Sequence, residues 1–512
     1  MNNKLHISAI YDYVVEISGK HNFVQNEIYH LKNDTNSLLM VISASENKAF
    51  CLVKEKSENY QIGLEVVKAS VSTKVATDVN YFGKIIDVYG NILYSKNGLS
   101  YQSAILPSQA EIFNVNNNLM TYQPLEEQLN TGYSVIDLLI PVGKGQRELI
   151  IGDRKTGKSF IALNTIINQK NKNVKCIYVA IGQNQNDLAN TYTLLEENNA
   201  LDYTIIINAS SDKPYEQYLA PYVGMAHAEN ISYNDDVLIV FDDLTKHANI
   251  YREIALLINK PVGKEAFPGD MFYAHARLLE RSGKFTNRKS ITALPIVQTV
   301  DNDITSLIAS NVISITDGQI VTNSELFALN KYPAINVNLS VSRIGGSVQS
   351  KLINQTAKII GKIYYAYKKQ AKLVAVKYDL NDDINSLITN GMQIEKMFNQ
   401  KGITSYNEQH MFLIAYIIEL NILNNLLENE IGHAINFLIK YQENNKACQD
   451  AVNNLVNSDA KNPTLLREYF TFLFAKYSEL FKLKWNIKAK KTFANIDAKL
   501  MQNIYAELKG AK

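Results

Sequence analysis

The sequence predicts a multidomain protein in which a small all-β domain, a central α/β domain with a mostly parallel sheet and a C-terminal α-helical domain follow one another. Three changes of pattern along the 512 residues carry this prediction. Residues 1–75 contain short apolar runs between turn residues. In residues 76–348 apolar strands alternate with helices, and residues 349–512 follow a 3.6-residue apolar period.

Composition limits the class of protein. Hydrophobic residues make up 46% of the chain and charged residues 20%, which allows large cores and excludes a disordered chain. The net charge of +2 is too balanced to indicate a nucleic-acid partner. Cys51, Cys176 and Cys448 are far apart and fit reduced thiols, and the first residues contain no apolar signal segment. We therefore expect a cytoplasmic protein, whose attachment to the inner face of the membrane would require partners.

The outer domains follow from local patterns. Near the N-terminus, Ile7–Tyr11 and Leu38–Ile42 predict short strands. In the helical domain the apolar run Met411–Ile418 is followed by a glutamate and is too short to span a bilayer. A basic end, formed by Lys482–Trp485 and Lys488–Lys491, is interpreted as the solvated face of a helix in preference to a binding patch.

The central domain contains nearly continuous apolar runs. Strands that are buried on both faces have this composition, so these runs predict a largely parallel sheet. The predicted strands include Cys176–Ile181, Val237–Phe241, Ile291–Val297 and Asn311–Ile315.

A phosphate-binding motif lies in this domain. Residues Gly152–Ser159 fit the pattern G-x-x-x-x-G-K-[ST], between a predicted strand, Glu148–Ile151, and a predicted helix, Phe160–Gln169. Backbone N–H groups in such a loop point at one anion, and the helix N-terminus adds to the attraction. Lys158 would reach the β- and γ-phosphates, and the Ser159 hydroxyl would hold Mg²⁺. The predicted nucleotide-binding residues are Gly152, Asp153, Arg154, Lys155, Thr156, Gly157, Lys158 and Ser159.

A second half of the site follows the strand Val237–Phe241, which ends in Asp242 and Asp243. In phosphate-loop enzymes a strand-end aspartate holds Mg²⁺ beside the loop hydroxyl. Asp242 is the better metal candidate because it comes first after the strand. His247 and His275 have no carboxylate or histidine at metal-ligand spacing, so we expect packed or surface residues rather than ligands.

Six segments of the central domain carry a further pattern. They are Pro141–Arg154, Tyr178–Gln183, Gly263–Asp270, Arg277–Arg281, Asn311–Gln319 and Pro333–Gly345. Together they resemble the noncatalytic alpha subunit of the rotary F-type ATP synthase. The resemblance is collinear from about Tyr81 to Gln349, whereas the outer domains agree only in size, order and class. It implies an N-terminal β-barrel (crown) domain, a RecA-like P-loop domain and a helical domain.

The resemblance also implies roles for single residues. Catalytic beta-type subunits carry a water-polarising glutamate where this chain has Gln183. An amide can orient a water but cannot act as a general base, so the site is expected to bind ATP or ADP with Mg²⁺ without turnover. Arg343 matches the arginine finger that reaches the γ-phosphate of a neighbouring subunit. Gln400 matches a residue that lines the adenine pocket.

The implied partners are a catalytic beta-type subunit in an alternating hetero-hexamer and a central gamma-type shaft. The chain enters its β domain at Ile7, whereas ordinary alpha subunits begin with a helical extension, and its helical domain is longer than usual. In this it resembles F-type-like ATPase paralogues of AT-rich, wall-less bacteria, of which one type is linked to gliding motility. We therefore expect a specialised ATP-driven motor with cytoskeletal or membrane-associated partners.

Departures from the family pattern leave nucleotide affinity and base selectivity open. They are Lys155, Gln298, Tyr332 and Gly402, which replace a glutamine, a glutamate, an arginine and a second adenine-lining glutamine.

Three alternative functions remain at this point. The chain could be an ordinary ATP synthase alpha subunit. It could be a hexameric RNA-dependent ATPase of the transcription-terminator type, although residues 1–75 lack a visible stacking platform. A scaffold without nucleotide is disfavoured by the intact Lys158, Ser159 and Asp242.

Overall fold

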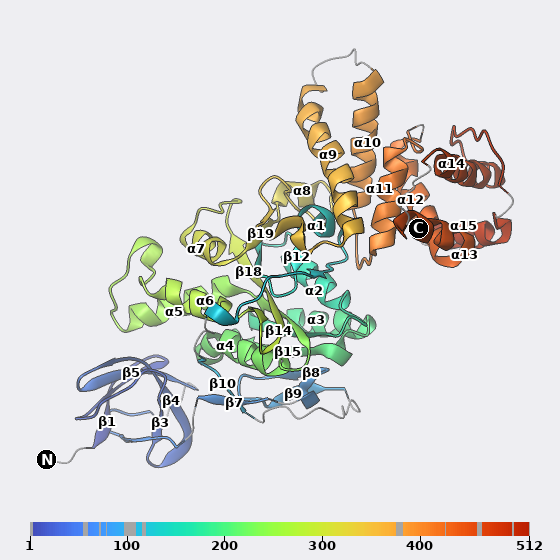
Figure 1. Cartoon of the computed structure of the whole chain (residues 1–512). Helices are drawn as coiled ribbons and strands as arrows, with labels where there is room; N and C mark the ends of the chain where they lie inside the picture. Colours follow the sequence, from blue (N-terminus) through green and yellow to red (C-terminus); the bar gives the residue numbers. More distant parts are fainter. Residues whose placement is uncertain are drawn as a thin grey trace. The chain divides into compact units, whose positions relative to one another are not determined.

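The computed structural model describes residues 4–54, 60–70, 73–77, 79–96, 109–114, 119–374, 382–424, 426–457, 463–493 and 496–510 (Figure 1). The chain divides into two compact units. The first comprises Met1–Thr131, Val142–Ala328 and Ala334–Ile344, and the second comprises Gly132–Pro141, Leu329–Pro333 and Gly345–Lys512.

The first unit begins with a closed barrel whose strand order is β1-β2-β5-β4-β3-β6. The strands are β1 (Leu5–Tyr11), β2 (Val14–Ser18), β3 (Ile28–Leu31), β4 (Asp34–Ser45), β5 (Lys48–Val53) and β6 (Glu65–Lys68). Pairing of β6 with β1 closes the barrel and leaves no free sheet edge. Its interior is filled by alternating side chains such as Val15, Ile17 and Val41. The predicted N-terminal β-barrel is confirmed.

The same unit contains a ten-stranded sheet with the order β20-β19-β13-β18-β16-β14-β15-β8-β9, in which β17 pairs with β18. Strands β19, β13, β18, β16, β14, β15 and β8 are parallel, and the antiparallel strands β9, β17 and β20 add to this core. The bounds are β8 (Lys84–Ile86), β9 (Ile92–Ser95), β13 (Glu148–Asp153), β14 (Val174–Gln183), β15 (Thr204–Ser210), β16 (Asp236–Asp242), β17 (Gly283–Phe285), β18 (Arg288–Thr299), β19 (Gly318–Val321) and β20 (Val341–Ser342).

Helices cover both faces of this sheet. The crossovers from β13 to β14 and from β14 to β15 progress in one direction, and the later crossovers return in the other. Right-handed connections therefore put α2 and α3 on one face and α4 to α7 on the opposite face (Figure 1). The helices are α2 (Lys158–Ile167), α3 (Gln185–Glu197), α4 (Pro214–Ile231), α5 (Leu244–Leu257), α6 (Met271–Leu279), α7 (Leu307–Ile315) and α8 (Ser324–Ala328). The unit also contains two small two-stranded sheets. They pair β7 (Lys74–Ala76) with β10 (Gln109–Glu111) and β11 (Gln128–Leu129) with β12 (Val142–Gly143).

One predicted strand is wrong. Residues Asn311–Ile315 form the second half of helix α7. Ile308 and Val312, one helical turn apart, are buried, whereas Ser310 and Ser314 are exposed. This is the burial pattern of a helix that packs on one side. A five-residue apolar run cannot by itself distinguish a buried strand from a buried helix, which explains the error.

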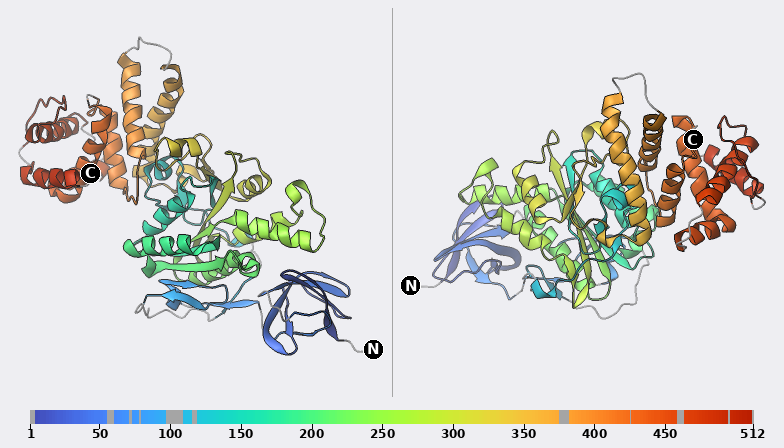
Figure 2. Two further views of the ribbon diagram at one scale, coloured as in Figure 1. Left: turned by 180° about the vertical axis from the view of Figure 1, so that it is seen from behind. Right: turned by 45° about the horizontal axis from the view of Figure 1, so that its top comes forward.

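The second unit is helical, as predicted. It contains α1 (Ser134–Leu139), α9 (Lys351–Val374), α10 (Asp382–Phe398), α11 (Glu408–Glu419), α12 (Glu428–Asn444), α13 (Lys446–Asn457), α14 (Pro463–Leu480) and α15 (Ala498–Gly510). Helices α9 and α10 run side by side in both views of Figure 2. Among the described residues, no helix combines the length and the hydropathy needed to cross a membrane.

The C-terminal helices share an aromatic core. Phe437 on α12 stacks on Tyr477 of α14 with ring centroids 3.6 Å apart, and Trp485 packs against Tyr477 and Phe474. The basic end was predicted as a helix face, and this prediction is wrong. Residues 483–493 lie between α14 and α15 without helical structure, and the buried Trp485 alternates with exposed lysines, which is the pattern of an extended segment.

Candidate nucleotide-binding site

The phosphate loop joins β13 to α2 at the carboxyl edge of the parallel sheet. Two glycines are needed there for different reasons. A Cβ atom on Gly152 would lie 2.1 Å from the Thr322 hydroxyl, so no larger residue fits against the end of β19. Gly157 has open space but a φ of 86°, which L-amino acids rarely adopt. The loop is also held internally, because the Thr156 hydroxyl donates to the Asp153 carbonyl at 2.8 Å and lies 2.7 Å from the Thr322 hydroxyl.

The N-terminus of α2 is open to an anion. Its N-cap residue, Gly157, has no side chain to accept hydrogen bonds from the first amide groups of the helix. Lys158 is 6% exposed, its ammonium donates to the Asp153 carbonyl, and it forms no ion pair with any described carboxylate. Burial lowers the pKa of Lys158, and the nearby Asp243 and Asp242 oppose this shift. Free amides and a buried unpaired cation together fit a phosphate group.

The other loop residues surround this position. Ser159 is half-buried in the first turn of α2, and the Arg154 and Lys155 side chains are exposed. The Asp153 carboxylate accepts hydrogen bonds from the Thr299 hydroxyl at 2.6 Å and from the backbone N–H of Asn302 at 2.9 Å. It therefore fixes the loop to the end of β18 rather than facing a ligand.

The two aspartates after β16 have different surroundings. The Asp243 carboxylate caps helix α5 by accepting from the backbone N–H of Lys246 at 2.9 Å, and it also accepts from the Gln298 amide at 2.6 Å. Burial raises the pKa of Asp243 to about 6, with a further contribution from Asp242. Asp242 receives the Tyr178 hydroxyl on Oδ2 at 2.6 Å, and its Oδ1 accepts no hydrogen bond from a described residue. Asp242 is thus the carboxylate with a free oxygen for a cation or its water.

Gln183 lies beside Asp242 at the end of β14. Its Nε2 donates to the Tyr178 hydroxyl at 3.0 Å and more weakly to the Asp242 carbonyl at 3.5 Å. Its Oε1 is buried and has no partner among the described residues. An unpartnered buried acceptor next to a free carboxylate oxygen fits a hydrated cation whose water would donate to the amide. Mg²⁺ bound by phosphates, a hydroxyl and one carboxylate does not require a cluster of protein ligands, and the described residues contain no such cluster.

Arg343 is not in contact with the phosphate loop, Asp242 or Gln183. It directly follows β20, the last strand of the sheet, where its backbone N–H donates to the Asp317 carbonyl at 2.9 Å. Its exposed guanidinium makes one long hydrogen bond, 3.4 Å to the Ile313 carbonyl, and no ion pair with a described carboxylate. Nothing in the described part of the chain links it to the phosphate loop of its own subunit.

Gln400 belongs to the helical unit, where both its Oε1 and its Nε2 make hydrogen bonds. Its Oε1 accepts from the backbone N–H and the hydroxyl of Ser134, both at 2.7 Å, and its Nε2 donates to the Gly132 carbonyl at 3.0 Å. In this structure Gln400 ties α1 to the end of α10. A role of Gln400 in lining an adenine pocket remains a prediction.

Sequence reasoning missed two residues of the site. Tyr178 lies within a segment that carried the family resemblance, but only the fold places its hydroxyl on Asp242. Thr322, at the end of β19, contacts Thr156 of the phosphate loop although the two residues are 166 positions apart in the sequence. No sequence pattern indicates this role of Thr322. The contact between His247 and His275 was missed as well: both are packed in the interior, 3.2 Å apart, and burial lowers their pKa values to about 4 and about 3.

Comparison with known proteins agrees with this arrangement. Residues 132–342 match the ATP synthase alpha/beta family, nucleotide-binding domain. The chain is 46% identical over 419 residues to ATP synthase subunit alpha 2 of Mycoplasmopsis pulmonis, covering 81% of each chain. It is 39% identical over 407 residues to ATP synthase subunit alpha 1 of the same organism, covering 78% of this chain and 75% of the relative. It is 37% identical over 458 residues to ATP synthase subunit alpha of Wigglesworthia glossinidia brevipalpis, covering 85% of this chain and 88% of the relative. The chain therefore belongs to the alpha subunits of the ATP synthase family.

Proposed function

We propose that the chain is the noncatalytic, nucleotide-binding alpha-type subunit of a hexameric F-type-like rotary ATPase head. It would alternate with a catalytic beta-type subunit around a gamma-type shaft. The observation that carries this proposal is the amide of Gln183 beside Asp242, in a site whose phosphate loop is otherwise complete. An amide does not accept a proton from water at neutral pH, so nucleotide is bound and not hydrolysed.

The residues of the chain divide the work of binding. The uncapped amides of α2 and the Lys158 ammonium hold the phosphates of ATP or ADP. Ser159 and Asp242 hold Mg²⁺, and the Tyr178 hydroxyl fixes the Asp242 carboxylate from behind. When it is bound, Mg²⁺ neutralises part of the phosphate charge. Gln183 orients a water molecule and does not deprotonate it.

Arg343 acts on the neighbouring subunit. Its guanidinium is exposed on an edge of the sheet and unpaired with any described carboxylate, so it is free to approach an anion outside the chain. A finger supplied in trans stabilises the charge that develops on a transferring phosphoryl group and raises the rate by about 10³–10⁵. Through Arg343, a subunit that does not hydrolyse its own nucleotide contributes to catalysis in the neighbouring beta-type subunit.

We also propose that the head is a specialised ATP-driven motor, with cytoskeletal or membrane-associated partners, rather than a standard proton-coupled synthase. The support is the higher identity to subunit alpha 2 than to subunit alpha 1 within one wall-less organism, 46% against 39%. An ordinary synthase alpha subunit is the alternative. The complex would work in the cytoplasm, attached through partners to the inner face of the membrane.

Purification of the native complex tests this proposal. Isolation through a tag on this chain, followed by subunit identification and stoichiometry, should give equal amounts of the alpha-type and beta-type chains with one shaft subunit per head. Unfamiliar cytoskeletal or membrane partners would support the specialised motor. A proton-channel ring with a standard peripheral stalk would instead identify an ordinary synthase, and recovery of a homo-hexamer would contradict the alpha-type assignment itself.

A further inference from the structure

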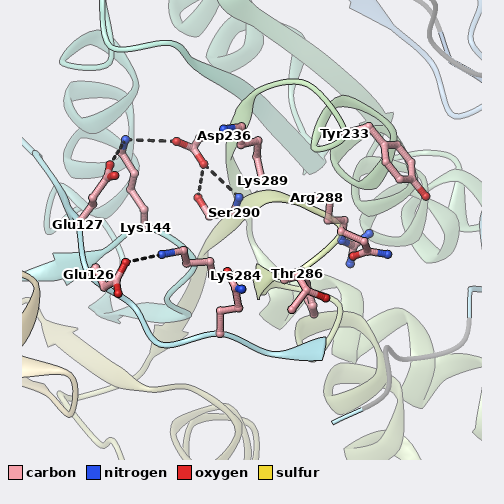
Figure 3. A pocket seen from close by; sticks show the side chains of 13 residues that line it. Glu126, Glu127, Lys144, Tyr233, Asp236, Lys284, Thr286, Arg288, Lys289 and Ser290 are labelled. Carbon is pink, nitrogen blue, oxygen red and sulfur yellow. Dashed lines mark hydrogen bonds and ion pairs between the residues drawn. The ribbon is translucent and has the colours of Figure 1, made fainter. Parts of the chain in front are cut away.

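A polar cavity lies at the amino ends of β16 and β18, on the opposite edge of the sheet from the phosphate loop (Figure 3). Its volume is about 410 Å³. Asp236 lines it at the start of β16, whereas Asp242 belongs to the nucleotide site at the end of the same strand. Six residues of extended chain separate the two by about 20 Å, so the cavity is a separate feature of the unit.

The lining carries four basic side chains against three carboxylates. Two of the basic side chains are neutralised locally. Lys144 donates to Glu127 at 2.7 Å and to Asp236 at 3.2 Å, and Lys284 donates to Glu126 at 2.9 Å. All three carboxylates are therefore in use. The positive charges that remain are Arg288 and Lys289.

Arg288 is a buried cation that shares its counter-ion with a second arginine. Its side chain is 5% exposed, and its closest carboxylate, Glu229, is 3.7 Å away. Arg281 already binds both oxygens of Glu229, at 3.0 and 2.8 Å. Two buried arginines thus share one carboxylate, and the second holds it only at long range.

The remaining contacts of Arg288 are weak. Its Nη2 donates to the Arg281 carbonyl at 3.3 Å, its guanidinium lies over the Phe285 ring at 4.2 Å, and its Nε has no partner among the described residues. Burial lowers the pKa of Arg288, Glu229 opposes this shift, and the like charge of Arg281 adds to it. A buried charge whose counter-ion is distant and shared costs free energy, so a further anion would stabilise this position.

Neighbouring groups define where this anion would sit. Figure 3 shows Thr286 close to Arg288 on one side of the cavity, with Glu126 and Glu127 on the other. Lys289 follows Arg288 in the chain, is exposed, and makes no ion pair with a described carboxylate. Glu126 and Glu127 are 72% and 69% exposed at their side chains, so they can accept further hydrogen bonds.

We propose that this cavity binds a small hydroxylated organic phosphate, with the phosphate on Arg288 and the Thr286 hydroxyl and the ligand's hydroxyl groups toward Glu126 and Glu127. The buried guanidinium, with the exposed Lys289 next to it in the chain, gives this part of the cavity an excess of positive charge, which suits a phosphate better than a single carboxylate. The planar guanidinium binds two phosphate oxygens at once, which an ammonium cannot do. The volume of the cavity exceeds that of inorganic phosphate and leaves room for a short polyol.

Calorimetric titration of the full chain in a Lys158→Ala background tests the proposal, because this substitution removes the main phosphate cation of the nucleotide site. The probes are ribose 5-phosphate, inorganic phosphate and acetate, at constant ionic strength set with chloride. We expect affinity to fall in that order. Arg288→Met should weaken ribose 5-phosphate binding at least tenfold, whereas Arg467→Met, a change of an exposed arginine on α14, should leave it unchanged.

A stability measurement separates a ligand site from an internal ion pair. Without ligand, Arg288→Met should keep or raise the melting temperature, because the substitution removes a buried charge whose counter-ion is distant and shared. Lys289→Glu, an exposed change that preserves the fold, should also weaken binding at least tenfold. The proposal is overturned if none of the probes binds, if both variants keep the parental affinity, or if Arg288→Met markedly lowers the melting temperature of the ligand-free chain.

Discussion

Replacement of Arg343 by alanine should separate assembly of the ring from its catalysis. In its own subunit the guanidinium makes only one hydrogen bond of 3.4 Å and is exposed. Its removal should therefore change stability by no more than about 0.5 kcal/mol, which is usual for surface positions. Loss of an arginine finger lowers the rate by about 10³–10⁵, which corresponds to about 4–7 kcal/mol of transition-state stabilisation.

The assay is steady-state ATP hydrolysis by the reconstituted ring of this chain and its beta-type partner, with ring assembly followed by gel filtration. Arg343→Lys should restore little activity, because an ammonium lacks the planar fork. Arg467→Ala is the matched control, since Arg467 is also exposed and unpaired with any described carboxylate. If the Arg343→Ala ring assembles and retains near-normal turnover, Arg343 does not act in trans. Loss of assembly would show that it holds the interface together instead.

Three further predictions follow from individual contacts. Tyr178→Phe removes the 2.6 Å hydrogen bond to Asp242. A hydrogen bond to a charged acceptor contributes about 1.5–3 kcal/mol, so Mg-ATP binding should weaken about tenfold or more in a fluorescence titration. Unchanged affinity would exclude a positioning role for Tyr178. Gly152→Ala places a Cβ atom 2.1 Å from the Thr322 hydroxyl and should lower the melting temperature strongly, whereas Gly432→Ala, with open space around it, should not. The lowered pKa values of His247 and His275 mean that the unfolded chain binds more protons below pH 6.5, so stability should fall by about 1.4 kcal/mol per pH unit for each histidine from about pH 6.5 toward pH 4. His247→Gln should reduce this dependence by the contribution of one histidine in denaturant titrations at several pH values.

The order of the three structural classes was predictable because each has its own apolar period. The alternating runs of the barrel, the continuous runs of β14, β16 and β18 and the helical period of the C-terminal part all appear in the structure. The secondary-structure predictions failed where the apolar run was too short to show a strand or a helix period. A run of five residues, Asn311–Ile315, was compatible with either a strand or a helix. The basic end has lysines on alternate positions, but the buried Trp485 that fixes its extended conformation could be recognised only from the packing.

The site shows the same division between local and tertiary information. The phosphate loop is a local motif, so its strand, turn and helix could be placed from the sequence. Tyr178, Thr322 and Gln298 act through partners that lie 64, 166 and 55 residues away. Gln400 illustrates the limit of a resemblance, because the structure gives its amide three hydrogen bonds inside the helical unit that no motif predicts.

Nucleotide binding and ATP turnover, measured together on the purified chain without its beta-type partner, test the noncatalytic assignment. We expect the chain to retain Mg-ATP at one site and to show no steady hydrolysis, because Gln183 lies where a general base would be needed. The Lys158→Ala variant should lose binding, which assigns the signal to the phosphate loop. Steady turnover by the isolated chain, abolished by Lys158→Ala, would contradict the noncatalytic assignment, and absence of binding by the parental chain would contradict the nucleotide site.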